Sequence, residues 1–195
     1  MDFLSAIKSI AGEECIFCNE MMSDHTTFKV GGPAKYFVVP YRAEDIKKYI
    51  LAAEEYKIPY YVIGNGSNLL VSDKGYDGMI IMLGRDLGNI TVNGDRITAE
   101  AGTSLARLFN TARRHSLSGL EFAAGIPGTL GGACYMNAGA YGGEMKDVLT
   151  KVITIDRQGN THEYKQGEME LSYRNSIFIR KQEIILSAEM KLCKG

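Results

Sequence analysis

The most informative segment of the chain reads Gly119-Leu-Glu-Phe-Ala-Ala-Gly125-Ile-Pro127-Gly128-Thr-Leu-Gly131-Gly132-Ala-Cys-Tyr-Met-Asn137-Ala-Gly139-Ala-Tyr141-Gly142-Gly143. A large share of the chain's 22 glycines falls within it. Glycine weakens both helices and strands by roughly 0.5–1 kcal/mol relative to alanine, so packing alone explains the concentration poorly. We expect backbone pressed against a flat or phosphorylated ligand, with Pro127 in the first turn of a short helix whose free amides face phosphate. A buried structural loop is the alternative.

A second glycine-containing turn reads Tyr61-Val-Ile-Gly64-Asn-Gly-Ser-Asn-Leu-Leu-Val71 and follows an expected strand. Its glycines let backbone amides approach an anion, and Ser67 and Asn68 can add side-chain hydrogen bonds. The turn is not a dinucleotide fingerprint, because Leu69 stands where the third glycine belongs. No Gly-Lys-Ser/Thr occurs in the sequence, which excludes a Walker loop. The turn is therefore a candidate for binding a pyrophosphate, with a plain strand connection as the alternative.

Regular elements are expected around these two segments. Ala43–Tyr56 carries an apolar stripe of Ile46, Ile50, Leu51 and Ala53, which predicts a helix. Asn93-Gly-Asp95 and Arg157-Gln-Gly-Asn160 lie between apolar runs and predict two hairpins, with strands at 90–92 and 97–99 and at 148–156 and 161–164. Further elements are expected as helices over 2–14 and from the N-cap Thr103 to about His115, and as strands over 35–40, 60–63, 79–83 and 183–192.

The order of these elements predicts an α+β fold made of two lobes that meet near residues 84–89. We expect the first lobe, with the N-terminal helix, over residues 1–86 and the second over residues 87–195. A nucleotide is expected in the cleft between the lobes.

Composition excludes several classes of function. The chain has 22 Lys+Arg and 23 Asp+Glu, a net charge of −1, so it lacks the basic footprint of nucleic-acid binding. Met1–Ser5 has no basic n-region, and no segment approaches the apolar length that spans a bilayer. We expect a soluble, cytoplasmic protein that binds neither nucleic acid nor membrane.

The pair Cys15-Ile-Phe-Cys18 has the spacing of a metal or redox site, and His25 lies nearby in the sequence. No second Cys-x-x-Cys completes a zinc site, and no thioredoxin-like strand precedes the pair. We expect two unpaired thiols and no metal.

Five segments occur in an order and at a spacing that are together specific. They are His25-Thr-Thr-Phe-Lys-Val-Gly-Gly-Pro33-Ala, Gly64-Asn-Gly-Ser-Asn-Leu-Leu70, Gly125-Ile-Pro-Gly-Thr-Leu-Gly-Gly132, Asn137-Ala-Gly-Ala-Tyr-Gly142 and Tyr173-Arg174-Asn-Ser176-Ile-Phe178. From about His25 to its C-terminus, the chain resembles the UDP-N-acetylenolpyruvoylglucosamine reductases. The resemblance implies a two-lobed FAD-binding fold of the vanillyl-alcohol-oxidase (PCMH) type.

The resemblance also implies the cofactors and the residues that hold them. It implies non-covalent FAD, NADPH as reductant and a small-molecule nucleotide-sugar substrate; the oligomeric state stays open. The pyrophosphate of FAD is assigned to Gly64, Asn65, Gly66, Ser67, Asn68 and Leu69. The ribityl chain and isoalloxazine ring are assigned to Gly125, Ile126, Pro127, Gly128, Gly131, Gly132, Asn137, Gly139, Ala140, Tyr141 and Gly142. Thr27 and the Val30–Pro33 turn support this cradle, and no context favours flavin attachment through His25, His115 or His162.

The implied reaction belongs to the synthesis of peptidoglycan precursors, and so to cell-wall biogenesis, cell shape and cell division. NADPH reduces FAD, and hydride then passes to the enolpyruvyl double bond, which leaves negative charge delocalised into the carboxylate. By this resemblance, Arg174 in Tyr173-Arg174-Asn175-Ser176 matches the family's active-site arginine. A guanidinium suits that role, because it stays charged and can bind a carboxylate through two parallel hydrogen bonds. The motif alone favours a surface or structural role for Arg174, and only the resemblance favours the catalytic role.

Parts of the family's machinery have no counterpart in this sequence. The proton-donating serine of a Gly-Ser-x-Phe-x-x-Pro-like motif, a later acidic residue and the domain that grips UDP are absent, and Ser176 is not expected to replace that serine. We expect a fragment that folds and holds FAD but does not complete turnover. Two alternatives remain: another oxidase of the same flavin fold, and a non-enzymatic FAD- or nucleotide-binding module.

Overall fold

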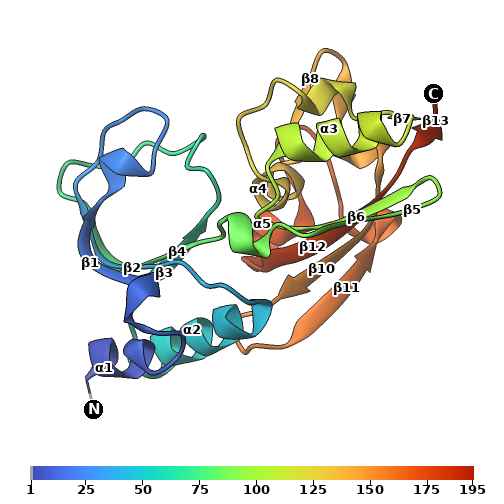
Figure 1. Cartoon of the computed structure of the whole chain (residues 1–195). Helices are drawn as coiled ribbons and strands as arrows, with labels where there is room; N and C mark the ends of the chain where they lie inside the picture. The colour runs from blue at the N-terminus through green and yellow to red at the C-terminus, as the bar shows by residue number, and fades with distance from the viewer. Residues whose placement is uncertain (1) are drawn as a thin grey trace. The chain divides into compact units, whose positions relative to one another are not determined.

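The computed structural model describes residues 2–195, apart from the side chain of Arg85 (Figure 1). The chain forms two compact units. The first unit comprises Met1–Leu87 together with Arg157–Gly159, and the second comprises Gly88–Asp156 and Asn160–Gly195. Both helices and strands occur in each unit, so the predicted α+β class is confirmed.

The first unit contains a four-stranded mixed sheet with the order β1-β2-β4-β3. Its strands are β1 (Ile16–Met21), β2 (Pro33–Val38), β3 (Tyr60–Ile63) and β4 (Tyr76–Met82). β1 pairs antiparallel with β2, whereas β2 and β3 both pair parallel with β4. Parallel neighbours need crossover connections, and here α2 (Ala43–Glu55) connects β2 to β3 while the glycine-containing turn at residue 64 lies between β3 and β4.

Two helices and a small core complete the first unit. α1 (Phe3–Lys8) is capped by Asp2, whose Oδ1 accepts from the Ser5 amide at 2.8 Å. One side of α2 is buried through Ile46, Tyr49, Ile50 and Ala53. The sheet encloses a cluster of buried residues: Met22, Ala34, Phe37, Ile63 and Ile80.

The second unit is built on a five-stranded antiparallel sheet with the order β11-β10-β12-β6-β5. Its strands are β5 (Ile90–Asn93), β6 (Arg96–Glu100), β10 (Leu149–Ile155), β11 (Thr161–Lys165) and β12 (Ile184–Lys191). α3 (Leu105–Arg114) follows β6 along the chain, α4 (Leu130–Tyr135) packs on β12 and β6, and α5 (Ile177–Lys181) precedes β12.

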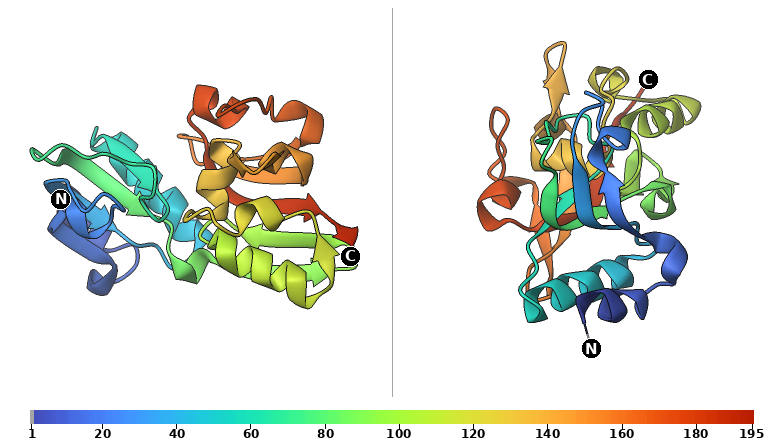
Figure 2. Two further views of the ribbon diagram at one scale, coloured as in Figure 1. Left: turned by 90° about the horizontal axis from the view of Figure 1, so that it is seen from above. Right: turned by 90° about the vertical axis from the view of Figure 1, so that its left-hand side faces the viewer.

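Two short pairs of strands complete the second unit. β7 (Leu117–Ser118) pairs with β13 (Cys193–Lys194), and β8 (Gly139–Ala140) pairs with β9 (Gly143–Glu144). The β8–β9 hairpin protrudes from the unit, as the right-hand view of Figure 2 shows. Short 3-10 turns lie at Glu13–Cys15, Met22–Asp24, Arg85–Leu87, Glu121–Ala123, Met145–Asp147 and Gln166–Glu168.

Elements with strong local signals were predicted correctly. The helix expected over 43–56, the strand over 60–63 and both hairpins are present within a residue or two of their expected ends. One detail of the helix was wrong, because Leu51 is 41% exposed and Tyr49 takes its place in the buried stripe. Tyr49 repeats at helical spacing with Ile46 and Ala53, so burial follows the period of the helix rather than the hydrophobicity of single residues.

Three other predictions were wrong at helix starts and ends. The helix expected over 2–14 ends at Lys8. The N-cap of α3 is Ser104, whose Oγ accepts from the Arg107 amide at 3.3 Å, and not Thr103. Pro127 does not lie in the first turn of a helix, because α4 begins at Leu130 with Thr129 as its N-cap. β1 and α5 were not predicted at all.

Candidate functional site

A pocket in the first unit brings together two segments that the sequence singled out separately. It has a volume of about 430 Å³ and is lined by Asp24, His25, Thr26, Thr27, Lys29, Gly64, Asn65 and Met82. The sequence placed Gly64 and Asn65 in a pyrophosphate-binding turn and Thr27 in its support. The structure puts all three around one cavity.

Gly66 makes this arrangement possible. Its φ is +61°, and a Cβ at this position would lie 1.9 Å from the carbonyl oxygen of His25. The amide of Thr27 donates to the Gly66 carbonyl at 3.2 Å, so the two loops touch backbone to backbone. Thr26, which is 2% exposed, donates from Oγ1 to the Val30 carbonyl at 3.0 Å and holds the next turn. At position 66, only glycine allows the two loops to lie this close together.

The remaining residues of the turn differ in what they contact. Leu69 is partly buried and packs against the core of the first unit, so its side chain has a structural contact. Ser67 and Asn68 lie at the bend that follows Gly66. Leu70 is 77% exposed.

Cys15 and Cys18 flank the start of β1 rather than a ligand cavity. Cys15 is buried, Cys18 is exposed, and both are free thiols. His25 pairs with Glu20 across 2.9 Å and stacks on Phe37. Within residues 2–195, no group of three or more His, Cys, Asp or Glu side chains is placed to hold a metal ion.

The glycines of the second unit fall into two groups according to what surrounds them. A Cβ added at Gly125 or Gly142 would meet no atom within 4 Å, and one at Gly132 would meet only Thr129 Oγ1 at 3.8 Å. By contrast, a Cβ at Gly131 would lie 2.8 Å from the Ala101 Cβ, and one at Gly139 would lie 2.6 Å from the Gly143 carbonyl oxygen. Gly131 and Gly139 therefore serve close packing inside the protein, whereas the other three leave open surface.

A tight turn at Tyr141 and Gly142 joins β8 to β9. The φ angles of these residues are +51° and +86°, as a two-residue hairpin turn with positive φ at both positions requires. Tyr141 is 97% exposed at the tip of the hairpin. Gly139 and Ala140, which were both assigned to the flavin, form the first strand of this hairpin.

Asn137 lies at the base of the hairpin and is 1% exposed. Its Nδ2 donates to Glu144 Oε2 at 2.5 Å and to the Ser172 carbonyl at 2.9 Å. Its Oδ1 accepts from the backbone N–H of Lys146 at 2.9 Å. The side chain that the sequence assigned to the flavin is thus turned into the protein.

Arg174 occupies a turn closed by two hydrogen bonds. The amide of Ser172 donates to the Asn175 carbonyl and the amide of Asn175 donates to the Ser172 carbonyl, both at 3.1 Å. Arg174 has a φ of +51°, and its Nη2 donates to the Gly139 carbonyl at 3.1 Å. Among the described residues this is the only hydrogen bond that the exposed guanidinium makes, so its other N–H groups remain available to an anion.

Two neighbouring side chains complete the surroundings of Arg174. The ring of Tyr173 lies 5.6 Å from the guanidinium carbon and is 86% exposed at the surface. Ser176 is 2% exposed and donates from Oγ to the Tyr135 carbonyl at 2.6 Å. This hydroxyl proton is engaged inside the protein, which makes Ser176 a poor donor to a substrate.

Glu144, the last residue of β9, carries a negative charge that its neighbours stabilise. The ion pair with Lys146 is the main cause that holds the pKa of Glu144 below its usual value of 4.5, and the hydrogen bond from Asn137 and the positive charge of Arg174 act in the same direction. In return, Glu144 raises the pKa of Lys146. The negative charge of Glu144 is thus neutralised mainly by Lys146.

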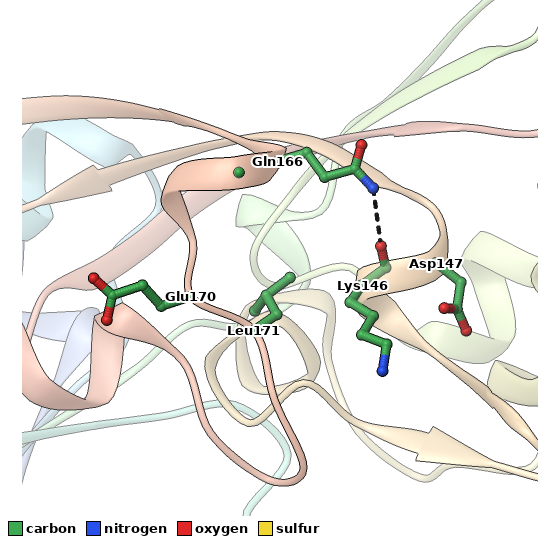
Figure 3. A pocket seen from close by; sticks show the side chains of 6 residues that line it. Lys146, Asp147, Gln166, Glu170 and Leu171 are labelled. Carbon is green, nitrogen blue, oxygen red and sulfur yellow. Dashed lines mark hydrogen bonds between the residues drawn. The ribbon is translucent and has the colours of Figure 1, made fainter.

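A second pocket, in the second unit, was not anticipated from the sequence. It has a volume of about 610 Å³ and is lined by Lys146, Asp147, Gln166, Gly167, Glu170 and Leu171 (Figure 3). Gln166 Nε2 donates to the Lys146 carbonyl at 3.2 Å across it. No sequence motif marks these residues, because they come from two segments about twenty positions apart.

Each unit, taken by itself, has features that suit FAD. The first unit offers a pocket at the Gly64–Asn65 turn, and the second offers open backbone at Gly125, Gly132 and Gly142, where side chains would otherwise cover the surface. Backbone amides without neighbouring side chains suit a pyrophosphate and a flat ring system. The FAD binding domain family matches residues 34–165. The chain belongs to the FAD binding domain family.

Individual relatives of this FAD binding domain carry a common name. The chain is 51% identical over 181 residues to the UDP-N-acetylenolpyruvoylglucosamine reductase of Syntrophomonas wolfei, covering 93% of the chain and 60% of that protein. The crystal structure of UDP-N-acetylenolpyruvylglucosamine reductase from Thermus caldophilus superposes with a TM-score of 0.77 at 36% identity, over 90% of this chain and 61% of that chain.

A more distant structure shows the fold alone. Substrate-bound p-cresol methylhydroxylase superposes with a TM-score of 0.70 at 14% identity, over 98% of this chain and 43% of that one. The expected PCMH-type fold is therefore confirmed.

The chain spans 60–65% of the length of these curated relatives. Across residues 2–195, none of the helices has the length and apolar character that crossing a bilayer requires.

Proposed function

We propose that the protein carrying this chain is an FAD-dependent, NADPH-driven reductase that converts UDP-N-acetylglucosamine enolpyruvate to UDP-N-acetylmuramate for peptidoglycan synthesis. The observation that carries the proposal is the 51% identity, over 93% of the chain, to a protein named UDP-N-acetylenolpyruvoylglucosamine reductase. The position of Arg174 beside the β8–β9 hairpin supports it. The substrate is accordingly a small nucleotide sugar.

Each unit has its own part in holding FAD. In the first unit, the backbone of Gly64 and Asn65, supported by Thr27, would hold the pyrophosphate. In the second unit, the open backbone at Gly125 and Gly132 would lie against the ribityl chain and the ring. When bound, FAD supplies the two-electron transfer from NADPH to the substrate. The attachment is expected to be non-covalent, as the resemblance to the reductase family implies, and the rings of His25 and His162 each pair with a carboxylate through Nε2.

Arg174 would act on the charge that develops in the substrate. Hydride addition to the terminal carbon of the enolpyruvyl group leaves negative charge on the adjacent carbon and in the carboxylate. The guanidinium remains cationic at any physiological pH and can donate two parallel hydrogen bonds to that carboxylate. A fixed positive charge at this place stabilises the transition state more than the ground state.

The proton that completes the reduction needs another donor. The hydroxyl of Ser176 already donates to the Tyr135 carbonyl, so it is unsuited to the task. The relatives contain further residues that this chain does not cover. We propose that the proton donor and the binding site for UDP lie in the corresponding part of the full-length protein. By itself, this chain would bind FAD without completing turnover.

The decisive experiment is a visible spectrum of the purified protein, before and after adding FAD, with any released cofactor identified by chromatography. A flavin spectrum, bleached anaerobically by NADPH and restored by UDP-N-acetylglucosamine enolpyruvate in the full-length protein, supports the proposal. Rapid reoxidation by oxygen, with bleaching by an alcohol or sugar instead, would indicate an oxidase of the same fold.

One observation favours a second candidate for the chain on its own, namely a non-enzymatic FAD-binding module. The chain covers less than two thirds of its relatives. Retention of FAD by the 195-residue chain without reduction by NADPH would favour this module. A 195-residue chain that takes up no FAD would overturn the module, and a full-length protein that takes up none would overturn both candidates.

A further inference from the structure

We infer that Asn137 is a positioning residue: its buried carboxamide holds the turn that carries Arg174 in register with the β8–β9 hairpin. The inference rests on the proposed function, because it assigns Asn137 a task in the reaction of Arg174. The sequence placed Asn137 among the residues that touch the flavin. Its contacts point to another role.

The carboxamide has no free donor left for a ligand. It carries two N–H groups and one carbonyl, and both N–H groups are used on Glu144 and on the Ser172 carbonyl. The carbonyl accepts from the backbone N–H of Lys146. The residue is 1% exposed, so a flavin would have to displace one of these bonds to reach it.

Two of the three bonds connect the elements that surround the guanidinium. Through Glu144, Asn137 holds the second strand of the hairpin, and through the Ser172 carbonyl it holds the entry to the turn. Arg174 itself donates to the Gly139 carbonyl on the first strand, so the turn is also bonded directly to the hairpin. The guanidinium therefore keeps its place only if hairpin and turn keep theirs.

The exit of the turn is fixed independently. Ser176 donates to the Tyr135 carbonyl at 2.6 Å, and the paired bonds between Ser172 and Asn175 close the turn itself. With the exit anchored, loss of the bond at the entry would let the turn pivot about Ser176. Such a pivot moves the guanidinium without unfolding the unit.

Asparagine suits this position for two reasons. The backbone of Asn137 has a φ of +44°, a left-handed conformation that asparagine tolerates better than most side chains. Both atoms facing its Nδ2 are acceptors, and the atom facing its Oδ1 is a donor. An isosteric aspartate would turn two of these attractions into contacts between acceptors.

The first test is Asn137→Asp in the full-length protein. FAD content and flavin reduction by NADPH should stay near wild type. Flavin reoxidation by the enolpyruvyl substrate should fall about tenfold to a hundredfold at pH 8, the order expected for a misplaced catalytic group. The rate should recover as the pH is lowered, because a protonated carboxyl regains one donor toward Glu144.

This pH dependence has identifiable contributors. The introduced carboxylate would face Glu144 directly, with Lys146 paired to Glu144 on the other side. Asp147 accepts from the Glu144 amide at 2.9 Å, and the Arg174 charge acts on Glu144 at longer range. The second negative charge raises the pKa of the carboxyl pair, whereas Lys146 and Arg174 oppose that rise, so the reoxidation rate should increase toward acid pH only in the variant.

A double variant tests the direction of the hydrogen bond. Asn137→Asp combined with Glu144→Gln exchanges donor and acceptor, so the contact at 2.5 Å becomes favourable again. Reoxidation should recover severalfold relative to Asn137→Asp alone and lose the new pH dependence. Asn160→Asp is the matched control, since Asn160 also donates from Nδ2 to a carboxylate, that of Asp156, but in an exposed turn. It should change neither half-reaction.

Amide hydrogen exchange of Asn175 provides a readout that does not depend on activity. Its N–H is bonded to the Ser172 carbonyl, so a pivoting turn should exchange faster in Asn137→Asp and not in Asn160→Asp. If Asn137→Asp does not fold, Asn137→Gly accepts the positive φ, removes the carboxamide and should show the same faster exchange and slower reoxidation.

The outcomes separate this inference from the function on which it rests. Wild-type reoxidation in a folded Asn137→Asp protein, or a loss shared with FAD content and independent of pH, would overturn the positioning role. If the wild-type flavin is not reoxidised by the enolpyruvyl substrate, the proposed function fails. If Arg174→Ala reoxidises normally, the role of Arg174 and with it the positioning role of Asn137 fail, while the proposed function stands. If Arg174→Ala is crippled and the variants of Asn137 are not, only the positioning role is lost.

Discussion

The guanidinium of Arg174 donates from Nη2 to the backbone carbonyl of Gly139 across 3.1 Å, although 35 positions separate the two residues. A carbonyl is a neutral acceptor, so the bond orients the side chain without cancelling its charge. The nearest acidic group of the hairpin, Glu144, is paired with Lys146 instead. Arg174 is thus held in place and still able to bind an anion.

Arg174→Ala in the full-length protein should leave FAD content and reduction by NADPH intact. Flavin reoxidation by the enolpyruvyl substrate should slow by about a hundredfold to a thousandfold, as for other preorganised groups that stabilise developing charge. Anaerobic stopped-flow absorbance measures the two half-reactions separately. Arg180→Ala is the control, because Arg180 is an exposed arginine of α5 that is paired with Glu170. Normal reoxidation in Arg174→Ala would remove this residue from the mechanism.

Gly66→Ala, in the first unit, should lose more stability than Gly94→Ala, in the second unit. Both glycines have nearly the same positive φ, +61° and +62°, which costs an alanine about 1–2 kcal/mol. Only at Gly66 would the new methyl group also meet a backbone atom, the His25 carbonyl oxygen at 1.9 Å, whereas nothing lies within 4 Å at Gly94. Urea unfolding of both variants gives the difference. Equal losses would show that the loops at His25 and Gly66 lie farther apart than described.

Gly131→Ala and Gly132→Ala should separate packing from cofactor binding within α4. At Gly131 the methyl group would press on the Ala101 Cβ from 2.8 Å, which should cost about 1–3 kcal/mol of stability. At Gly132 the space is open, so alanine should stabilise the FAD-free chain by up to about 1 kcal/mol. If the flavin lies against this surface, Gly132→Ala should weaken FAD binding severalfold, as measured by fluorescence titration. Unchanged affinity would place the flavin elsewhere.

Thr103→Val and Thr154→Val should shift stability in opposite directions. Both residues are buried, at 1% and 0% exposure. The hydroxyl of Thr103 has no hydrogen-bond partner among the described residues, so its removal should be neutral or stabilise by about 1 kcal/mol. Thr154 donates to the buried Glu183 at 2.5 Å, and its loss should cost about 1.5–3 kcal/mol. Thermal unfolding of the FAD-free chain checks both. A destabilised Thr103→Val would reveal a partner for that hydroxyl, such as a buried water.

Local patterns predicted the elements whose signals lie within a few residues. The stripe of α2 and the turn residues of both hairpins depend on neighbours close in sequence. β1 was not predicted, because most β1 residues are exposed and the strand is defined by its pairing with β2, which comes later in the chain. α5 has only five residues, too few to show a helical period.

The candidate site was predictable as a set of segments but not as a set of contacts. The sequence marked Gly64 and Asn65, Thr27 and Arg174, and the structure places the first three around one pocket. It could not tell that Asn137 would use its side chain on Glu144 and Ser172. Nor could it tell that the side chain of Leu69 packs into the core, because an apolar residue beside a glycine turn fits either role.

By itself, the sequence determined the α+β class, the two glycine-rich segments and the resemblance to a flavin-dependent reductase, since each is written in residue types and short spacings. Tertiary structure alone decided which glycines serve packing and which leave open surface, because that depends on neighbours such as Ala101, thirty positions from Gly131. It also decided where the Arg174 guanidinium is held. Hydrogen bonds to Gly139 and through Asn137 exist only once the folded chain has brought distant backbone groups within 3.1 Å.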